Sequence, residues 1–593
     1  MADKTYRVQP WNLDELFTSF DDPQIEVAIE QVDAEVQALE ALRPELIAET
    51  PSQVLLQFLD GYEALSRQLS RLAGYASLRF SADTQDQRAQ TFQARTRQLL
   101  AEVDNRTLFF KLWWKALADD EADRLLAEAG DYAYWLEALR LQRPYTLSEP
   151  EEQVINLKDV NGPNALITLY TSITNRYAFL LEVEGGQLEL TRGQLSRYVW
   201  GTNPDLRAGA YQELYRVYGQ DAPVLGQIYQ ALVRDWHSEQ VQLRGFGNPM
   251  AVRNLANHIP DEVVETLLEV SRANAPLFHR YFKLKAEWLG MDRLRRYDIY
   301  APVAEADIDY PYNEAIGRIL ASFEEFDPQV AALAARVLDE DHMDSQVRKG
   351  KRDGAFCATI TPDLTPYVLA NYQGKARDVA TIAHELGHAV HSQLAAEHNA
   401  LTQGASLPLA ETASTFGEML LVDEMLSQDA NPAVQRDLLV RQLDDNYATI
   451  MRQAYFSMFE VAAHDAIRDG ASVDELSELY LANLTEQFGD SLDLSDEFRY
   501  EWVSIPHFYN SPFYVYAYAF GQLLVLSLYQ RYQQEGEAFK PAYLDILRAG
   551  GSAAPMTILD QAGIDVRQPS FWQGGFDVIA ATMRRLEELQ VPS

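Results

Sequence analysis

The stretch DVATIAHELGHAVHSQLAAEH, residues 378–398, has the length and the 3.6-residue periodicity of an amphipathic helix. Asp378 is a residue type favoured at helix N-caps, so we expect the helix to begin there. On a wheel of about 100° per residue with His384 at the origin, His388 falls at about 40° and His391 at about 340°. Apolar residues occupy the opposite face. The pattern predicts a helix whose apolar face packs inward and whose three histidines share the other face.

Helix spacing separates the histidines that could bind one metal ion from those that could not. His384 and His388 are one turn apart, about 6 Å along the axis, and their nitrogens can converge on an ion at about 2.0–2.1 Å. His391 lies about 10.5 Å from His384 along that axis. We therefore expect His384 and His388 to be metal ligands and His391 to be a second-shell or substrate-facing group.

Two residues between these histidines have positions that suit particular roles. Glu385 lies about 100° from His384, where it can reach a water held on the metal without being a ligand. That is the role of the glutamate in an H-E-x-x-H motif. Gly387 costs a helix about 1 kcal/mol relative to alanine. We expect another backbone to approach Gly387 closely.

The third ligand must come from elsewhere in the chain. The arrangement H-E-x-x-H-x-x-G-x-x-H does not fit, because it needs Gly at His391 and His at Leu394. Downstream, LPLAETASTFGEML, residues 407–420, supplies Glu411 and Glu418 on a second predicted helix. The two lie about 10.5 Å apart along a helix axis, so only one can be a ligand. We choose Glu411 and expect Glu418 to be a second-shell partner or a salt-bridging surface residue.

Composition limits the classes of function that the chain can have. The sequence is 47% hydrophobic and 23% charged, which is ordinary for a globular protein. Its formal net charge of −38 repels nucleic acid and anionic membranes, so neither is an expected partner. The only cysteine, Cys357, excludes an intrachain disulfide and cysteine-based zinc sites. It should be a small buried apolar residue.

The chain shows no sign of export or membrane insertion. Its first residues, MADKTYRVQPWNLDELF, lack the basic and apolar regions of a signal peptide. The stretch LLVLSLY, residues 523–529, is among the longest apolar runs and is far shorter than the roughly 20 residues that span a bilayer. We expect a cytoplasmic protein. The sequence gives no prediction of its oligomeric state.

Most of the chain has helical periodicity, which predicts a mainly α fold. The segments starting at Ser52 and Thr84 should form a helical hairpin. FLLEVEGGQLELT, residues 179–191, alternates around two glycines and predicts a β-hairpin. Residues 354–374 predict a small sheet beside the histidine helix. We place a boundary near residue 190, which gives an N-terminal helical domain, 1–190, and a catalytic domain, 191–593.

These residues together resemble a known family. The pattern H-E-L-G-H-A-V-H, followed by L-A-E-T-A-S with 22 residues between His388 and Glu411, is similar to oligoendopeptidase F and other thimet-oligopeptidase-like zinc peptidases. The similarity extends over RYDIYAPV (296–303), residues 351–374 and IPHFYNSPFYVYAYAFG (505–521). The resemblance implies a multi-helical zincin-type fold with a deep substrate channel. It also implies one Zn²⁺ per chain and cleavage of short peptides.

The resemblance also implies roles for individual residues. The family's zinc ligands fall on His384, His388 and Glu411, and its catalytic glutamate falls on Glu385. Its substrate- and oxyanion-contacting groups fall on His507, Tyr509 and Tyr516. Phe513 stands where the family pattern has a tyrosine, and Tyr514 is expected to take over that role. By spacing alone, the aromatic residues of 505–521 are more typical of a core than of a catalytic site, and the neighbouring His507 favours function.

The sequence therefore predicts a zinc-dependent oligoendopeptidase with Glu385 as general base. The strand residues Gly354, Ala355 and Phe356 could pair with a peptide substrate or belong to an ordinary buried hairpin. Zinc is preferred over cobalt or manganese because of ligand type and availability. One alternative is an exopeptidase of similar fold. Another is a catalytically silent helical protein that binds peptides.

Overall fold

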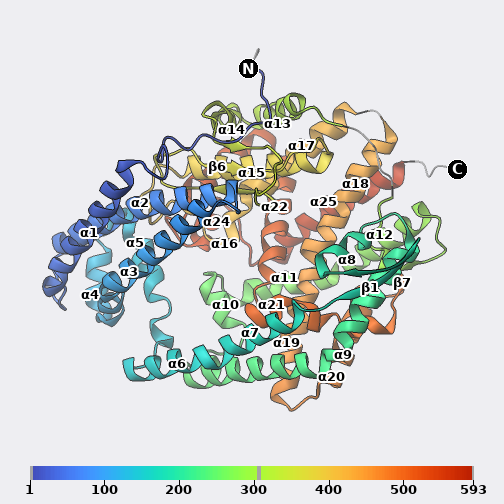
Figure 1. Ribbon diagram of the computed structural model, residues 1–593, viewed down its shortest axis with the longest axis horizontal. Coiled ribbons are helices and arrows are strands. Elements are labelled where there is room, and N and C mark those ends of the chain that lie inside the picture. The colour runs from blue at the N-terminus through green and yellow to red at the C-terminus, as the bar shows by residue number, and fades with distance from the viewer. Residues whose placement is uncertain (1–3, 304–308, 430, 590–593) are drawn as a thin grey trace. The chain divides into compact units, whose positions relative to one another are not determined.

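The computed structural model describes residues 4–303, 309–429 and 431–589, and most of them are helical (Figure 1). The predicted mainly α fold is therefore confirmed. The chain forms two compact units, each assembled from three segments. Unit 1 contains residues 1–143, 307–428 and 531–564, and unit 2 contains residues 144–306, 429–530 and 565–593. The predicted domain boundary near residue 190 is not tested by these units and stays a prediction.

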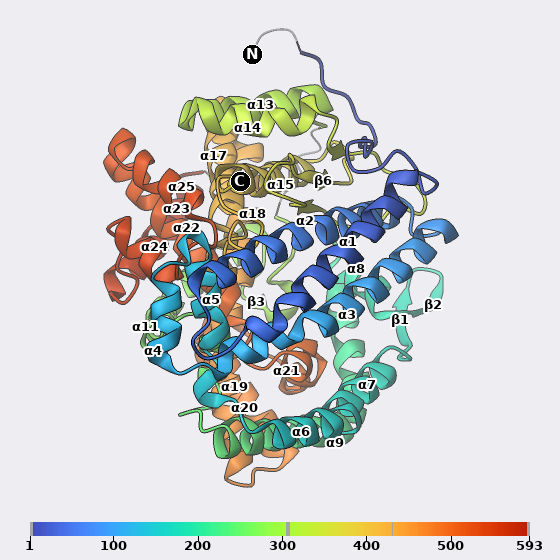
Figure 2. The same ribbon diagram turned by 90° about the vertical axis from the view of Figure 1, so that its left-hand side faces the viewer.

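Unit 1 combines the N-terminal helices with the histidine helix. Its elements are α1 Pro23–Leu42, α2 Ser52–Ala82, α3 Gln87–Ala116, α4 Asp119–Leu126, α5 Ala133–Arg140, α13 Tyr312–Phe326, α14 Pro328–Asp339, β4 Met343–Asp344, β5 Phe356–Ala358, β6 Tyr367–Leu369, α15 Ala376–Leu394, α16 Leu407–Ala410, α17 Thr412–Gln428, α23 Lys540–Ala549 and α24 Pro555–Gln561. Helices α1, α2 and α3 pack side by side (Figures 1 and 2), which confirms the predicted hairpin of α2 and α3.

The N-terminal helices share a hydrophobic core with the small sheet of unit 1. That sheet has the order β4-β6-β5, with β4 parallel and β5 antiparallel to β6. Tyr367 and Leu369 of β6 belong to the same cluster of buried residues as Phe58 of α2 and Phe110 of α3. Strand β5 lies at one edge of this sheet, and among the described residues its one strand partner is β6. The predicted sheet beside the histidine helix is confirmed, because β5 and β6 both contact α15.

Helix α15 packs along α17 in unit 1, and Gly387 permits the close approach. A Cβ atom at Gly387 would lie 2.5 Å from the Ala413 carbonyl oxygen and 2.6 Å from the Ser414 Cα. Both atoms belong to the backbone of α17, so they cannot rotate away. The predicted approach of another backbone is confirmed. It fixes the distance between the helix that carries the histidines and the helix that begins after Glu411.

Gly387→Ala should therefore destabilise unit 1 by roughly 1–3 kcal/mol, because the added methyl forces the two helices apart. The matched control is Gly317→Ala in the middle of α13, where an added Cβ meets no atom within 4 Å. That control should stabilise the helix by up to about 1 kcal/mol, because alanine has the higher helix propensity. Urea denaturation of both variants measures the difference. Equal effects at the two glycines would contradict the packing argument.

Unit 2 is also helical and contains the predicted hairpin. Its elements are α6 Glu149–Asn161, α7 Pro163–Thr174, β1 Phe179–Val183, β2 Gly186–Leu190, α8 Arg192–Val199, α9 Pro204–Trp236, α10 Ala251–Ala256, α11 Asp261–Ala273, α12 Ala275–Trp288, β3 Leu294–Arg295, α18 Pro432–Asn446, α19 Arg452–Arg468, α20 Val473–Phe488, β7 Leu492–Asp493, α21 Pro506–Asn510 and α25 Pro569–Glu588. Helix α22 Tyr516–Glu535 contains the division between the units at residues 530 and 531. Strands β1 and β2 pair antiparallel as predicted, with positive φ angles at Gly185 in the turn and at Gly186, the first residue of β2. Among the described residues, no helix has both the length and the hydropathy that crossing a bilayer requires.

Candidate metal centre

Helix α15 carries the two candidate histidine ligands, and it begins earlier than the sequence predicts. Its N-cap is Lys375 rather than Asp378. Asp378 is the third residue of the helix, and its carboxylate accepts hydrogen bonds from the backbone N–H groups of Gln373, at 2.7 Å, and Lys375, at 3.1 Å. The prediction was wrong in position because an aspartate can cap a helix end from inside the first turn as well as from the N-cap.

The predicted ligand atoms converge in unit 1. Glu411 lies between the short helix α16 and helix α17, in a break that turns its side chain toward α15. Its Oε2 is 3.3 Å from His384 Nε2 and 3.4 Å from His388 Nε2. A tetrahedral ion with bonds of about 2.1 Å separates its ligands by about 3.4 Å. The two imidazoles and the carboxylate therefore fit a zinc ion in both donor chemistry and spacing.

The second glutamate of the predicted pair contacts the opposite side of His384. Glu418 Oε1 is 2.5 Å from His384 Nδ1, so the ring lies between two carboxylates. Burial lowers the pKa of His384, but the hydrogen bonds with Glu411 and Glu418 outweigh burial and raise it to about 10. Burial raises the pKa of Glu411, and its hydrogen bond with His384 outweighs this and lowers the pKa to about 2. Both shifts indicate that this group of side chains attracts a cation.

Two further groups lie beside the candidate ligands, and sequence reasoning missed both of them. The Ser414 hydroxyl donates a hydrogen bond to Glu411 Oε2 at 2.8 Å. The backbone carbonyl of Ala410 lies near the rings of His388 and His391, where it favours their protonated forms and so acts to raise the pKa of both. Burial is the main reason that the pKa of His388 is lowered and that of His391 falls to about 4. A serine three residues after Glu411 was only a weak sequence signal of a contact with that glutamate. The position of a backbone carbonyl gives no signal in a sequence.

Glu418→Gln should weaken zinc binding by roughly 10–100-fold, because a ligand histidine loses the carboxylate that orients its ring. The control is Glu424→Gln on the same helix, where the carboxylate lies 4.0 Å from Arg318. Competition with a chromogenic zinc chelator measures both affinities. Equal zinc affinities for the two variants would contradict an orienting role for Glu418.

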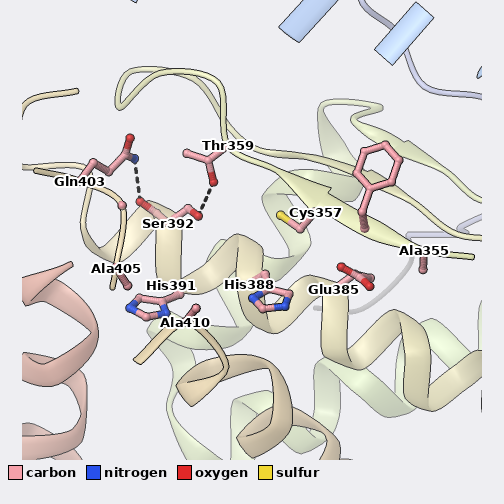
Figure 3. Close-up of a pocket in the computed structure, with 12 residues that line it drawn as sticks. Ala355, Cys357, Thr359, Glu385, His388, His391, Ser392, Gln403, Ala405 and Ala410 are labelled. Atoms are coloured by element: carbon pink, nitrogen blue, oxygen red, sulfur yellow. Dashed lines mark hydrogen bonds between the residues drawn. The ribbon is translucent and has the colours of Figure 1, made fainter. Parts of the chain in front are cut away.

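Glu385 and His388 line a cavity of about 370 Å³ within unit 1 (Figure 3). Glu385 is 7% exposed, and burial raises its pKa to about 7. Cys357 also lines the cavity and is only partly buried, which differs from the expectation of a buried apolar residue. Burial and the nearby charge of Glu385 keep the pKa of its thiol well above the ordinary value. A carboxylate that can accept a proton therefore lies beside the candidate ligands.

The three predicted strand residues take different places at the cavity. Ala355 and Phe356 line it, while Gly354 has a φ of 83° and its carbonyl accepts a hydrogen bond from the Asn371 amide at 2.9 Å. The Phe356 ring packs 6.2 Å from the Trp11 ring. Strand β5 therefore borders the cavity, and one of its two edges is not paired with β6.

The loop after α15 forms another wall of the cavity and is held by distant parts of unit 1. Asp131 accepts hydrogen bonds from His398 Nδ1 at 2.9 Å, from the backbone and side chain of Asn399 at 3.1 and 2.7 Å, and from the Thr402 hydroxyl at 3.0 Å. On the other side, the Gly551 N–H donates to the Thr402 carbonyl at 2.8 Å. Gln403, Gly404 and Ala405, which follow directly, line the cavity.

The predicted oxyanion residues all lie in unit 2, where the structure brings two of them together at the surface. The rings of His507 and Tyr514 are parallel with centroids 6.1 Å apart, and Tyr518 contacts both rings edge-on. Phe513, just before Tyr514, has a φ of 57°, and its N–H donates to the buried Glu460 carboxylate at 2.7 Å. This held turn sets the direction in which Tyr514 leaves the backbone.

The other two predicted tyrosines lie in the core of unit 2. Tyr509 is 1% exposed, stacks on Tyr170 with ring centroids 3.7 Å apart, and donates its hydroxyl proton to the Leu225 carbonyl at 3.3 Å. The Tyr516 hydroxyl is buried and accepts a hydrogen bond from the Asn257 amide at 2.9 Å. Both hydroxyls are thus engaged inside the unit. Of the predicted set, His507 and Tyr514 have accessible side chains.

Comparison with known proteins matches the chain to a peptidase family. The sequence model of Peptidase family M3 matches residues 200–578, and that of Oligopeptidase F matches residues 113–179. The chain is 29% identical to the group B oligopeptidase PepB of Streptococcus agalactiae over 91% of this chain and 90% of that protein. It is 26% identical to oligopeptidase PepF of Bacillus subtilis over 98% of this chain and 87% of that protein.

Solved structures share the fold. A Chlamydophila abortus protein with a provisional assignment as a peptidase has a TM-score of 0.89 and 24% identity, covering 98% of this chain and 100% of its own. Oligoendopeptidase F from Enterococcus faecium has a TM-score of 0.70 and 23% identity, covering 95% and 98%. The match to the family model over residues 200–578, together with the metal-binding geometry on α15 and α17, shows that this chain belongs to peptidase family M3.

Proposed function

We propose that this peptidase is a zinc-dependent oligoendopeptidase that hydrolyses internal bonds of short peptides. The observation that supports this proposal is the convergence of His384, His388 and Glu411, with Glu385 lining a cavity that His388 also lines. The ligand atoms of the first three lie within 4.8 Å of one another. Two imidazoles and one carboxylate form the donor set of a catalytic zinc site that keeps a position open.

Each of these residues has a role that follows from its chemistry. Bound zinc would supply a Lewis acid that polarises the scissile carbonyl and acidifies a water. His384, His388 and Glu411 would hold the ion, while Glu418 orients the His384 ring. Glu385 accepts a proton from the attacking water and passes it to the leaving amine. Its burial favours this, because a desolvated carboxylate accepts protons more readily.

The oxyanion that forms during peptide hydrolysis needs hydrogen-bond donors. The resemblance assigns these to residues 505–521, and among them the accessible His507 and Tyr514 suit the role better than the engaged Tyr509 and Tyr516. Tyr514→Phe keeps the ring and removes the hydroxyl. We expect this change to lower kcat by roughly 10²-fold with little change in zinc content. Tyr509→Phe is the matched control, and an equal loss of kcat there would contradict this choice.

Peptide binding through the unpaired edge of β5 would give affinity without strong sequence preference. Main-chain hydrogen bonds to residues 354–356 would hold an extended chain, which suits short unfolded peptides. Three of the relatives named above are called oligopeptidases or oligoendopeptidases, which supports the same substrate class. A cytoplasmic location, one zinc per chain and the lack of nucleic-acid or membrane partners remain predictions from the sequence.

The test is cleavage of an internally quenched peptide blocked at both ends, combined with metal analysis of the purified protein. One zinc per chain and cleavage at an internal bond are expected. Cleavage only after the termini are freed would favour an exopeptidase, the second candidate. Zinc without any cleavage of blocked or free peptides would favour a silent peptide-binding protein. A protein that is active without a metal would exclude the proposed mechanism.

A further inference from the structure

The peptide unit between Pro512 and Phe513 is held on both sides by charged side chains of other helices in unit 2. Its N–H belongs to Phe513 and donates to the Glu460 carboxylate of α19 at 2.7 Å. Its carbonyl belongs to Pro512 and accepts a hydrogen bond from Arg253 Nε of α10 at 3.3 Å. The donor and the acceptor of one peptide unit are therefore both fixed by distant parts of the chain. We call Arg253 and Glu460 the peptide clamp.

The clamp lies directly before Tyr514 in the sequence, and Arg253 also contacts the ring of this tyrosine. The guanidinium carbon of Arg253 is 5.8 Å from the centroid of the Tyr514 ring, a distance typical of a cation–π contact. The rings of His507 and Tyr518 contact the same tyrosine. One arginine thus holds both the backbone that leads into Tyr514 and the ring itself.

The clamp has features that are unfavourable for stability. Phe513 has a φ of 57°, a left-handed conformation that residues other than glycine rarely adopt. Glu460 is 1% exposed, and burial raises its pKa to about 8. Its second oxygen, Oε2, has no hydrogen-bond partner among the described residues, and a buried oxygen without a donor destabilises a fold. Such features cluster at functional sites, where a fixed geometry is needed.

We infer that Arg253 and Glu460 are positioning residues, which fix the Pro512–Phe513 peptide so that the Tyr514 hydroxyl stays where it can donate to the oxyanion. Neither residue touches the substrate in this role, because both act through Tyr514. A displacement of about 1 Å in a catalytic group can lower a rate by about 100-fold. The inference rests on the proposed function, in which Tyr514 is a donor, and adds two residues outside 505–521 to it.

The first test replaces Glu460 in two ways and measures kcat and KM on the doubly blocked peptide. Glu460→Leu has a similar volume but leaves the Phe513 N–H without an acceptor. Its kcat should fall roughly 10-fold or more, with little change in KM or zinc content. Glu460→Gln keeps a side-chain oxygen for that N–H and should retain kcat within about twofold. A kcat near the wild-type value in Glu460→Leu would overturn the inference, as would an equal loss in Glu460→Gln.

Arg253→Met tests the other side of the peptide at a position that is only partly buried, so the inference stays testable if Glu460→Leu does not fold. It keeps an apolar stem and loses both the donor to the Pro512 carbonyl and the cation over the Tyr514 ring. We expect kcat to fall several-fold. The matched control is Arg272→Met on α11, which removes an exposed ion pair and should leave kcat within about twofold. Equal kcat values for the two variants would contradict the role of Arg253.

A third comparison places the same substitutions in a Tyr514→Phe background. If the clamp acts through the Tyr514 hydroxyl, Glu460→Leu and Arg253→Met should each change kcat by less than about twofold once that hydroxyl is gone. A loss of folded or zinc-loaded protein would instead lower kcat by the same factor in both backgrounds, and that result would overturn the inference.

The same measurements separate the clamp from the proposed function. Wild-type protein that lacks zinc, or cleaves no internal bond, would contradict the proposed function and the clamp together. An unchanged kcat in Tyr514→Phe would exclude Tyr514 as the donor and the clamp with it. A loss of kcat in Tyr514→Phe, without a loss in Glu460→Leu or Arg253→Met, would contradict the clamp alone.

Discussion

Glu385→Gln is expected to retain one zinc per chain and to lose roughly 10²–10⁴-fold or more in kcat on a doubly blocked peptide. Glutamine has nearly the same shape as glutamate, so the cavity and the neighbouring ligands keep their positions. Its amide cannot accept the proton that the attacking water must lose. Zinc content, kcat and KM should be measured together, and KM should change much less than kcat.

The control for this substitution is Glu397→Gln, at an exposed glutamate that follows α15 and does not line the cavity. It removes the same charge from the same part of unit 1 and should leave kcat within about twofold, as for a surface substitution of small effect. If Glu385→Gln keeps more than about a tenth of the wild-type kcat, Glu385 is not the general base.

Glu411→Ala should weaken metal binding, whereas Glu385→Gln should impair proton transfer. It removes one of three candidate ligands, so zinc affinity should fall by more than the roughly 10–100-fold expected for Glu418→Gln. Activity should fall with zinc occupancy and should recover in part when zinc is added in excess. Isothermal titration with zinc, after chelation of the purified protein, measures the affinity directly.

Glu411→Asp provides the matched control, because it keeps the carboxylate and shortens its reach. Its zinc affinity should lie between those of wild type and Glu411→Ala. If Glu411→Ala keeps full zinc occupancy and activity, the ligand assignment is wrong and Glu418 becomes the candidate. The contact between Glu418 and His384 Nδ1 makes that alternative testable with Glu418→Ala in the same titration.

Much of the candidate centre could be predicted because helix periodicity is local. The spacing of His384 and His388 fixes their common face, and the cost of a glycine at position 387 indicates a close backbone neighbour. The hairpin around Gly185 and Gly186 was equally predictable, because tight turns need residues that adopt positive φ angles. In each case the physical cause lies within a few residues of its effect.

Features that depend on distant contacts were less predictable. Nothing in the sequence distinguishes the buried Tyr509 from the accessible Tyr514, because both belong to one aromatic stretch. The Ala410 carbonyl acts through its backbone, which every residue possesses. The burial of His391 depends on the parts of the chain that pack over α15, so spacing along the helix could only suggest that its ring differs from its neighbours.

The anchoring of the loop after α15 determines when, during synthesis, the cavity can form. Asp131 lies early in the chain, Thr402 in the middle, and Gly551 close to the end, yet all three meet at one wall of the cavity. Contacts between residues so far apart in sequence form late in folding, since long loops must close first. During synthesis, residue 551 leaves the ribosome after most of the polypeptide. The cavity wall is therefore expected to close only on a nearly finished chain, and nascent fragments should carry the histidine motif without a working peptidase.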